Sequence, residues 1–333
     1  MEHSKIGIVL LALFMLGSCG ECGKEEPAEP SPKKSRKKET VNVPEFNADS
    51  AYVYIEEQVA FGPRVPGTSA HSACADWLAR KLSSFADSLI VQKFSAQIYN
   101  GQTKAGKNII GVFNPEKRRR VLLCAHWDSR PFADQEEDKA LVNTPIDGAN
   151  DGASGVGVLM EIARNLKRKP INIGVDIIFF DLEDYGEPQG EQSRKENSWA
   201  LGSQHWSKNP HTFNYSANYG ILLDMVGVEN AQFLREGTSE YFASDILDKV
   251  WRQAQQLNYS DYFKNRRAGS ITHDHLYINQ ILGIPTINII ALEPAGNSIF
   301  FEHWHTLEDN MENIDKKALK ASGSTVSHVI YNE

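Results

Sequence analysis

An apolar run that ends on acidic residues constrains this chain more than any other feature. Residues 175–180 read Val-Asp-Ile-Ile-Phe-Phe, and Glu183-Asp184 follow shortly after. Such a run is typical of a strand buried in an α/β sheet, and ligands bind beyond the carboxyl ends of such strands. Because side chains alternate across a strand, two adjacent carboxylates can face different tasks. We therefore expect Glu183 and Asp184 to belong to a binding or catalytic site.

Strand-like and helix-like segments alternate along most of the chain. Apolar residues at helical spacing predict helices at residues 51–60, 70–85, 154–167, 241–257 and 314–330. Shorter apolar segments predict strands at residues 89–96, 108–113, 120–125, 219–225 and 286–291, besides the strand that ends at Asp181. This order predicts a largely parallel or mixed sheet with helices on both faces.

The first eighteen residues, 1–18, are interpreted as a signal peptide. Residues 6–16 are apolar but too few to span a membrane as a helix. Small residues then precede Cys19, a pattern that resembles the lipobox of bacterial lipoproteins. We expect lipidation of Cys19 and a membrane-anchored lipoprotein of the bacterial cell envelope, facing the periplasm or the cell surface. An ordinary secretory signal with an incidental cysteine is the alternative.

Composition separates a tether from a folded domain. Residues 19–42 are poor in apolar side chains and cannot repay the entropy of ordering, so they are expected to be a lipidated, disordered tether. Residues 43–333 form the predicted single catalytic α/β domain, because 41% hydrophobic content suffices for a core. The net charge of -8 argues against nucleic acid as a partner, and membrane contact is expected only through the lipid anchor.

Cys74 and Cys124 are the cysteines of this predicted domain. Cys124 lies in the apolar run of residues 121–125, where a thiol behaves as a small buried hydrophobe. We expect no disulfide between them.

Other polar residues follow predicted strands or occupy glycine-rich turns. His126 follows one apolar strand, and Asp151 lies in the glycine-rich segment 147–155 that opens a helix. A phosphate loop is a poor interpretation, because the segment lacks the usual lysine and Asp151 would repel an anion. Carboxylate and imidazole are zinc ligands, and a catalytic zinc keeps one position open beyond about three protein ligands. Taken singly, Asp151 could cap a helix and His126 could be a hydrogen-bonded structural residue.

Several of these segments resemble the zinc aminopeptidase clan and, within it, the animal-type glutaminyl cyclases and their bacterial relatives. The resemblance extends from Phe61 to Asn310. The matching segments are His126-Trp127-Asp128-Ser129, Gly148-Ala149-Asn150-Asp151, Phe179-Phe180-Asp181 with the acid pair, Leu223-Asp224-Met225 and His305-Thr306. It implies a three-layer α/β/α sandwich around a central twisted mixed β-sheet, with zinc at the carboxyl ends of strands.

The clan has two chemistries with different metal content. Its aminopeptidases hold two zinc ions, with Glu183 matching the base that activates water. The positions that match their ligands are His126, Asp151, Asp184, Asp224 and His305. Glutaminyl cyclases bind one zinc, through the positions matching Asp151, Asp184 and His305. His126 is then a hydrogen-bonded neighbour, whereas in an aminopeptidase it would be a ligand of the second metal. Trp304 resembles the cyclase pattern, so one zinc per chain is expected, or two in an aminopeptidase.

The resemblance also implies roles for pocket residues and acids. Trp304, Trp199 and Phe300 are assigned to aromatic walls that enclose a small side chain; Phe301 is the alternative to Phe300, and Tyr277 could add to the wall. Zinc would polarise the γ-carboxamide of an N-terminal glutamine while Glu183 carries a proton from the attacking α-amine to the departing ammonia. Asp224 and Asp274 match acids that share a hydrogen-bond network with that glutamate. Asp274, rather than either adjacent histidine, matches the family acid because its spacing from Gly283 is the same as in the family.

The expected activity is therefore a glutaminyl-peptide cyclotransferase that forms pyroglutamate on peptides or proteins with N-terminal glutamine. A two-zinc aminopeptidase that removes N-terminal residues is one alternative, and a binding lipoprotein without catalysis is another. Two features depart from the animal pattern. Asp184 stands where the animal enzymes have glutamate, which shortens the ligand by one methylene, and Arg130 follows Asp128-Ser129.

Overall fold

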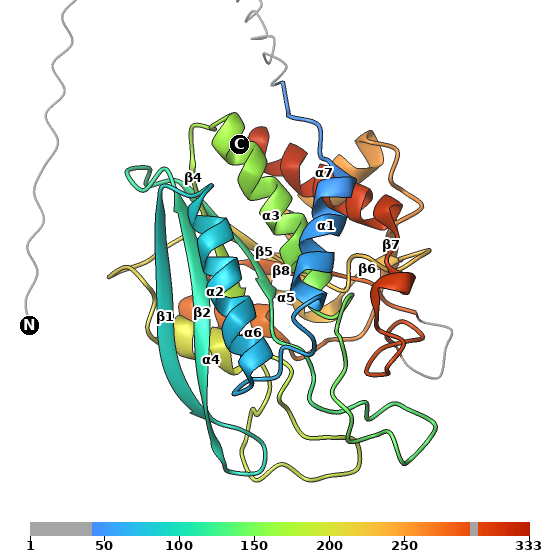
Figure 1. The fold of residues 1–333 in the computed structure, drawn as a ribbon. Coiled ribbons are helices and arrows are strands. Elements are labelled where there is room, and N and C mark those ends of the chain that lie inside the picture. Colours follow the sequence, from blue (N-terminus) through green and yellow to red (C-terminus); the bar gives the residue numbers. More distant parts are fainter. Residues whose placement is uncertain (1–41, 294–298) are drawn as a thin grey trace, which may run out of the picture. The chain divides into compact units, whose positions relative to one another are not determined.

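A six-stranded mixed sheet forms the centre of the domain. The computed structural model describes residues 42–293 and 299–333 (Figure 1). The strands of this sheet are β1 (Ser88–Gln97), β2 (Thr103–Phe113), β3 (Arg120–His126), β4 (Gly174–Phe180), β5 (Tyr219–Asp224) and β8 (Thr286–Ile290), in the order β1-β2-β4-β3-β5-β8. β2 pairs antiparallel with both β1 and β4, whereas β4, β3, β5 and β8 run parallel to one another. The predicted mixed sheet is confirmed.

Helices cover both faces of the sheet, as the three-layer prediction requires (Figure 1). The helices are α1 (Ala48–Val59), α2 (Ser69–Ser83), α3 (Ala153–Arg168), α4 (Leu201–Lys208), α5 (Gly237–Gln256), α6 (Asp274–Tyr277), η1 (Ile278–Leu282), η2 (Met311–Asn313) and α7 (Lys316–Tyr331). Leu123 of β3 belongs to a core formed with α1, α2, α3, α5 and α7. Its neighbour Leu122 faces the opposite core, which contains Trp206 of α4 and Ile278 of η1.

The predicted helices and strands are present, with ends shifted by a few residues. The helix expected at residues 241–257 begins earlier, as α5, because buried Glu236 caps it by accepting hydrogen bonds from Thr238 N and Ser239 N. The sequence prediction missed the short elements α4, α6 and η1 and the two-stranded sheet of β6 (Phe233–Arg235) and β7 (Phe263–Arg267). Elements this short contain too few apolar residues to show the hydrophobic periodicity of a helix or strand.

The strand order places a crevice between β3 and β5. After β3, α3 leads to β4 on one side, and α4 then leads to β5 on the other side of β3. Such a reversal opens a space between the carboxyl ends of the two strands, where ligands bind in open α/β sheets. His126 ends β3 and Asp224 ends β5, so both side chains lie at this crevice.

The predicted signal peptide, Cys19 and nearly all of the predicted tether lie outside the described residues. The described residues belong to the compact unit Val41–Glu333. None of the helices within 42–293 and 299–333 has the length and apolar character needed to cross a membrane. Cys74 and Cys124 are buried free thiols in the two separate cores, in agreement with the prediction of no disulfide.

Candidate metal centre and active site

Asp151, Asp184 and His305 converge at the carboxyl end of the sheet. All three are at least 96% buried, and their ligand atoms lie within 4.8 Å of one another. His305 Nε2 lies 3.3 Å from Asp184 Oδ1 and 3.7 Å from Asp151 Oδ2. Ligands about 2.0–2.1 Å from a tetrahedral zinc are about 3.4 Å apart, so this spacing fits zinc. Among the described residues no group hydrogen-bonds the buried Asp184 Oδ2, which leaves an oxygen available to a cation.

Buried carboxylates fix the backbone that carries two of these ligands. Asp128 accepts hydrogen bonds from Glu183 N at 3.1 Å and Asp184 N at 3.2 Å. Asp309 does the same for Asn150 N at 2.7 Å and Asp151 N at 3.1 Å. Each carboxylate therefore fixes a short loop segment without using the oxygen atoms of the ligands themselves.

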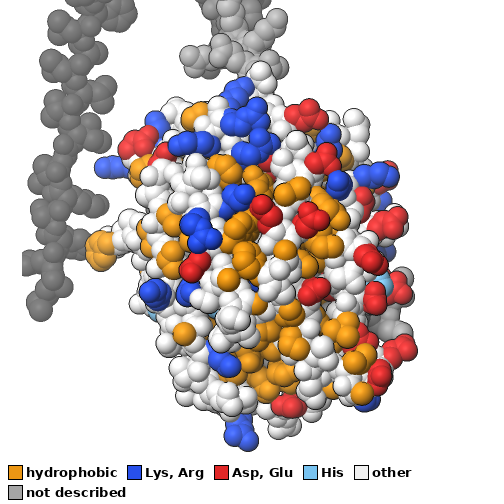
Figure 2. All heavy atoms as spheres, viewed as in Figure 1, with side chains coloured by type: hydrophobic (Ala, Val, Ile, Leu, Met, Phe, Trp, Pro, Cys, Tyr) orange, Lys and Arg blue, Asp and Glu red, His pale blue; other side chains and the backbone are white. Residues whose placement is uncertain are grey.

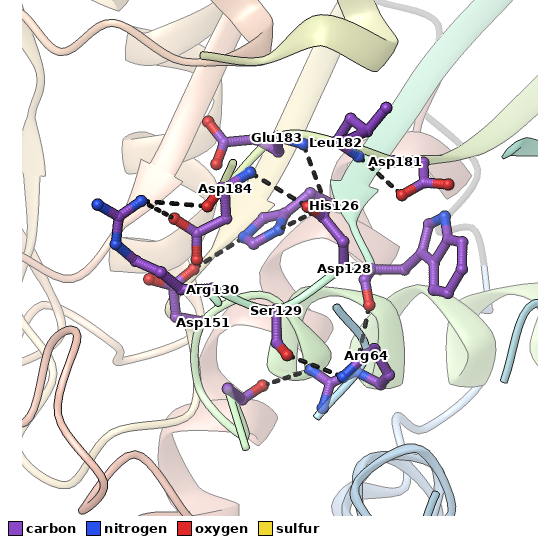
Figure 3. Close-up of polar contacts among 12 residues, drawn as sticks. Arg64, His126, Asp128, Ser129, Arg130, Asp151, Asp181, Leu182, Glu183 and Asp184 are labelled. Carbon is purple, nitrogen blue, oxygen red and sulfur yellow. Dashed lines mark hydrogen bonds and ion pairs between the residues drawn. The ribbon is translucent and has the colours of Figure 1, made fainter. Parts of the chain in front are cut away.

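A buried arginine joins the loops that follow β3 and precede α3. Arg64 is fully buried and donates to Trp127 O at 3.2 Å and to Gly148 O at 2.8 Å (Figure 3). These loops carry His126 and Asp151. The bonds hold one loop against the other, and burial, partly offset by nearby acids, lowers the pKa of Arg64.

Asp134 and Arg130 orient the two ligands His305 and Asp184. Asp134 Oδ1 lies 3.1 Å from His305 Nδ1, so the other ring nitrogen faces the metal position. Arg130 donates hydrogen bonds to Asp134 from Nε at 2.9 Å and from Nη2 at 2.7 Å. Its Nη1 donates to Asp184 O at 3.1 Å and to Asp184 Oδ1 at 3.4 Å (Figure 3). Burial would raise the pKa of Asp134, but Arg130 and His305 hold it far below its usual value. Arg130 thus supports the short ligand Asp184.

Strained backbone accompanies the site. Leu182, Met225 and His305 have φ values of 56°, 47° and 58°, in the left-handed region that side chains larger than glycine disfavour. Leu182 precedes Glu183, and Met225 follows Asp224. Non-glycine residues in this region cost free energy and cluster at functional sites.

Glu183 lines the pocket beside the three ligands and is 5% exposed. Burial raises the pKa of Glu183 well above its ordinary value, and Asp274 and Asp184 add to the effect, although His273 and His126 oppose it. A carboxyl group with a raised pKa can both accept and return a proton, as proton transfer at a reaction centre requires.

A second cluster of buried side chains lies beside Glu183. His126 Nε2 lies 2.9 Å from Asp151 Oδ1 and 3.3 Å from Asp224 Oδ1. His273 Nε2 lies 3.2 Å from Asp224 Oδ2, and one ligand atom from each of His126, Asp224 and His273 falls within 4.8 Å of the others. Burial would raise the pKa of Asp224, but the two histidines hold it below its usual value. This cluster has the chemistry to hold a second cation.

His273 is the pocket residue that sequence reasoning missed. Its ring nitrogen Nδ1 accepts a hydrogen bond from Asp274 N at 2.7 Å, which places the Nε2 proton toward Asp224. Asp274 is completely buried near Glu183 but does not line the pocket, and His275 binds Glu236 at 2.9 Å instead. The run His273-Asp274-His275 marked the segment, but only the structure distinguishes which side chain faces the pocket.

Aromatic residues surround the candidate centre. The pocket is lined by Asp151, Glu183, Asp184, Trp199, Asp224, Met225, Ile271, Thr272, His273, Phe300, Trp304 and His305. The Trp304 ring stacks on His305 with centroids 3.6 Å apart, and Phe300 lies 4.4 Å from Trp304. The Trp199 ring is nearly parallel to that of His305 at 6.3 Å. The three aromatic residues assigned to the pocket from the sequence all line it, whereas Phe301 is in the core.

The mixed sheet and the buried oxygen and nitrogen ligands at its carboxyl end define a metal-dependent α/β enzyme. The chain belongs to Peptidase family M28, whose model matches residues 108–330. A Tannerella forsythia glutaminyl cyclase structure is 53% identical, with a TM-score of 0.85 over 87% of this chain and 100% of that chain. A Zn-dependent exopeptidase structure from Parabacteroides distasonis is 52% identical, with a TM-score of 0.86 over 88% and 100%. The Bothrops jararaca glutaminyl-peptide cyclotransferase is 27% identical over 77% of this chain and 73% of its own length.

Proposed function

We propose that this chain is a zinc-dependent glutaminyl-peptide cyclotransferase, which converts N-terminal glutamine of peptides or proteins to pyroglutamate with release of ammonia. The observation that carries the proposal is Glu183 beside a buried Asp151, Asp184 and His305 triad in an aromatic pocket. The likeness to glutaminyl cyclases along most of the chain supports the same activity.

Glu183 is the proton carrier in this proposal. When bound to Asp151, Asp184 and His305, zinc supplies a Lewis acid for the γ-carboxamide oxygen. Glu183 takes a proton from the attacking α-amine and delivers it to the departing ammonia, a transfer that its raised pKa favours. Trp199, Phe300 and Trp304 limit the space for water, so that the substrate's own amine is the nucleophile.

Asp224 and His273 act on the substrate's amine side of the pocket. Among the carboxylates that line the pocket, Asp224 is the one whose pKa is lowered. We assign it the role of binding the positively charged form of the α-amine before proton transfer. His273 holds Asp224 in place through its Nε2 proton. Asp274 is the third acid of this proposed network: its buried carboxyl group acts electrostatically on Glu183, and its backbone N–H sets the orientation of the His273 ring.

One zinc per chain is part of the proposal. In this arrangement His126 hydrogen-bonds the Asp151 oxygen that does not face His305, and so acts as a positioning residue. A two-zinc aminopeptidase remains the second candidate function, because His126, Asp224 and His273 form a further buried group able to hold a metal. The likeness to a Zn-dependent exopeptidase is consistent with that alternative.

The proposal places this activity on a lipid-anchored domain. Cys19 follows the apolar residues 6–16 and is the proposed lipidation site, with residues 1–18 removed and residues 19–42 serving as a tether. The domain would then act at the bacterial cell envelope on peptides outside the cytoplasm.

Mass spectrometry of peptide products tests the proposed function. The full chain is incubated with a peptide that begins with glutamine and with a matched peptide that begins with alanine, while bound zinc is counted by elemental analysis. Loss of one ammonia from the glutamine peptide alone, with one zinc per chain, is expected. Release of the N-terminal residue from either peptide, with two zinc ions per chain, would instead identify an aminopeptidase, and no product from either peptide would contradict both enzymes.

A further inference from the structure

We propose that a basic hollow at the start of the described chain is the surface by which the domain docks on an anionic membrane. The hollow has a volume of about 790 Å³ and lies between the beginning of α1, the end of α3 and the beginning of α7. Its cationic residues are Arg164, Arg168, Lys169, Lys316, Lys317 and Lys320. Its acidic lining residues are Glu45 and Asp49, so positive charge dominates it although the whole chain has a net charge of -8.

The two acidic residues do not neutralise this surface. Lys316 pairs with Asp49 at 2.7 Å and Lys320 with Glu45 at 3.1 Å, but the side chains of these acids are 79% and 83% exposed. Pairs this exposed bind weakly and exchange readily with other partners. Arg164 is paired with the buried Glu161 at 2.6 Å, whereas Arg168 and Lys317 have no ion-pair partner within the described part of the chain. Several cations are therefore available to an anionic surface.

The lysines of α7 are not explained by the stability of that helix. Lys316 and Lys317 are its first residues, and Asp315 before them caps the helix by accepting a hydrogen bond from Lys317 N at 2.9 Å. Cations at a helix N-terminus oppose the positive end of the helix dipole. Arg168 and Lys169, in contrast, lie at the end of α3, where positive charge is favourable. The α7 lysines thus add positive potential at a cost to their own helix.

The hollow and the metal centre lie at opposite ends of β4. The last residues of α3 line the hollow, and the chain then enters β4 at Gly174. β4 ends at Phe180, just before Glu183 and Asp184. In Figure 2, Lys and Arg side chains gather at the end of the domain where α1 begins and α3 ends in Figure 1. Docking through the hollow would direct the active site away from the membrane.

Chain connectivity identifies a membrane as the occupant. Asn42 lines the hollow, and the sequence before it contains the basic run 33–38 and the proposed lipidation site Cys19. A lipid attached at Cys19 would restrict the start of the domain to the vicinity of a bilayer. Lysine and arginine near anionic headgroups each increase membrane affinity several-fold. This inference rests on the proposed lipid attachment and is independent of the proposed catalytic residues.

Vesicle co-sedimentation tests the proposal with residues 19–333 carrying Cys19→Ala, which excludes both the apolar residues 6–16 and lipidation as sources of binding. Vesicles of phosphatidylcholine alone are compared with vesicles that also contain phosphatidylglycerol. Binding is expected only to the anionic vesicles and is expected to disappear in high salt. The double variant Arg168→Glu with Lys317→Glu should lower the partition coefficient by at least about tenfold.

The matched control is Lys139→Glu with Lys208→Glu, which changes net charge equally at exposed positions outside the hollow. This control should bind like the parent, and all forms should keep the parent's turnover of a soluble glutamine peptide. Equal loss of binding in both double variants, equal binding to neutral vesicles, or no binding by the parent would overturn the proposal. The proposal would also be overturned if Arg168→Glu with Lys317→Glu had no effect on vesicle binding and binding were lost only when the lysines at 33–38 were replaced.

Discussion

Asp134 Oδ1 lies 3.1 Å from His305 Nδ1, and the same carboxylate is gripped by Arg130. A buried carboxylate at one ring nitrogen fixes the orientation of the imidazole and increases the basicity of the other nitrogen. This contact therefore defines the orientation in which His305 meets a cation.

Replacing Asp134 with asparagine should weaken zinc binding by about 10- to 100-fold, because the amide orients His305 less firmly and adds no negative charge. Competition with a chromophoric chelator measures the affinity. Glu137→Gln, at an exposed position in the same loop, is the matched control and should bind zinc normally. Unchanged affinity in Asp134→Asn would show that His305 is oriented by other contacts.

Glu183→Gln should retain zinc but reduce turnover by at least about 100-fold, because glutamine cannot accept the amine proton. Elemental analysis and the ammonia release rate separate the two properties. A variant that turns over at the parent's rate would assign proton transfer to another group.

His305→Ala should lose zinc and activity together, because two protein ligands hold the ion much less tightly than three. His303→Ala is the control, since His303 lies two residues away and outside the ligand cluster. Stoichiometric, tightly bound zinc in His305→Ala would remove this histidine from the metal centre.

The pH dependence of kcat/KM should show an acidic limb above the ordinary glutamate pKa of 4.5, because the buried Glu183 must be ionised to accept a proton. The raised pKa of Glu183 also makes the stability of the fold depend on pH, but stability decreases as pH rises. Its stabilising contribution is present below pH 4.5 and is lost as pH rises through the folded-state pKa. Zinc-free Glu183→Gln should therefore be more stable than zinc-free parent at alkaline pH, which thermal unfolding at two pH values can check. The reverse order would contradict the raised pKa.

Glu236→Gln tests the contribution to stability of a buried carboxylate that caps α5 and is not a metal ligand. Burial would raise the pKa of Glu236, but bonds from His275, Ser239 and nearby backbone lower it to about 2 from 4.5. A lowered pKa contributes stability above pH 4.5 that is lost as pH falls toward 2. Chemical denaturation should show a loss of about 3 kcal/mol at neutral pH, at 1.36 kcal/mol per pKa unit, that shrinks in acid. Exposed Glu229→Gln should show neither effect.

The parallel part of the sheet was predictable because β3, β4, β5 and β8 are buried along their whole length and appear as apolar runs. Glu183, Asp224 and His126 could be predicted because each lies at or just beyond the end of a strand, and the end of the apolar run indicates that position in the sequence. Asp134 was missed because it lies in a loop without periodicity and meets His305 only through the tertiary fold. His273 was missed because adjacent residues of similar chemistry give no sign of which faces inward.

The metal ligands come from three widely separated parts of the chain: the turn before α3, the segment after β4 and the loop after β8. No short fragment can assemble this centre, so binding of the ion is coupled to folding of nearly the whole domain. An ion that binds only the folded state shifts the unfolding equilibrium in proportion to the logarithm of its free concentration. The melting temperature should therefore vary with free zinc, and zinc limitation would shorten the lifetime of the folded protein as well as slow its chemistry.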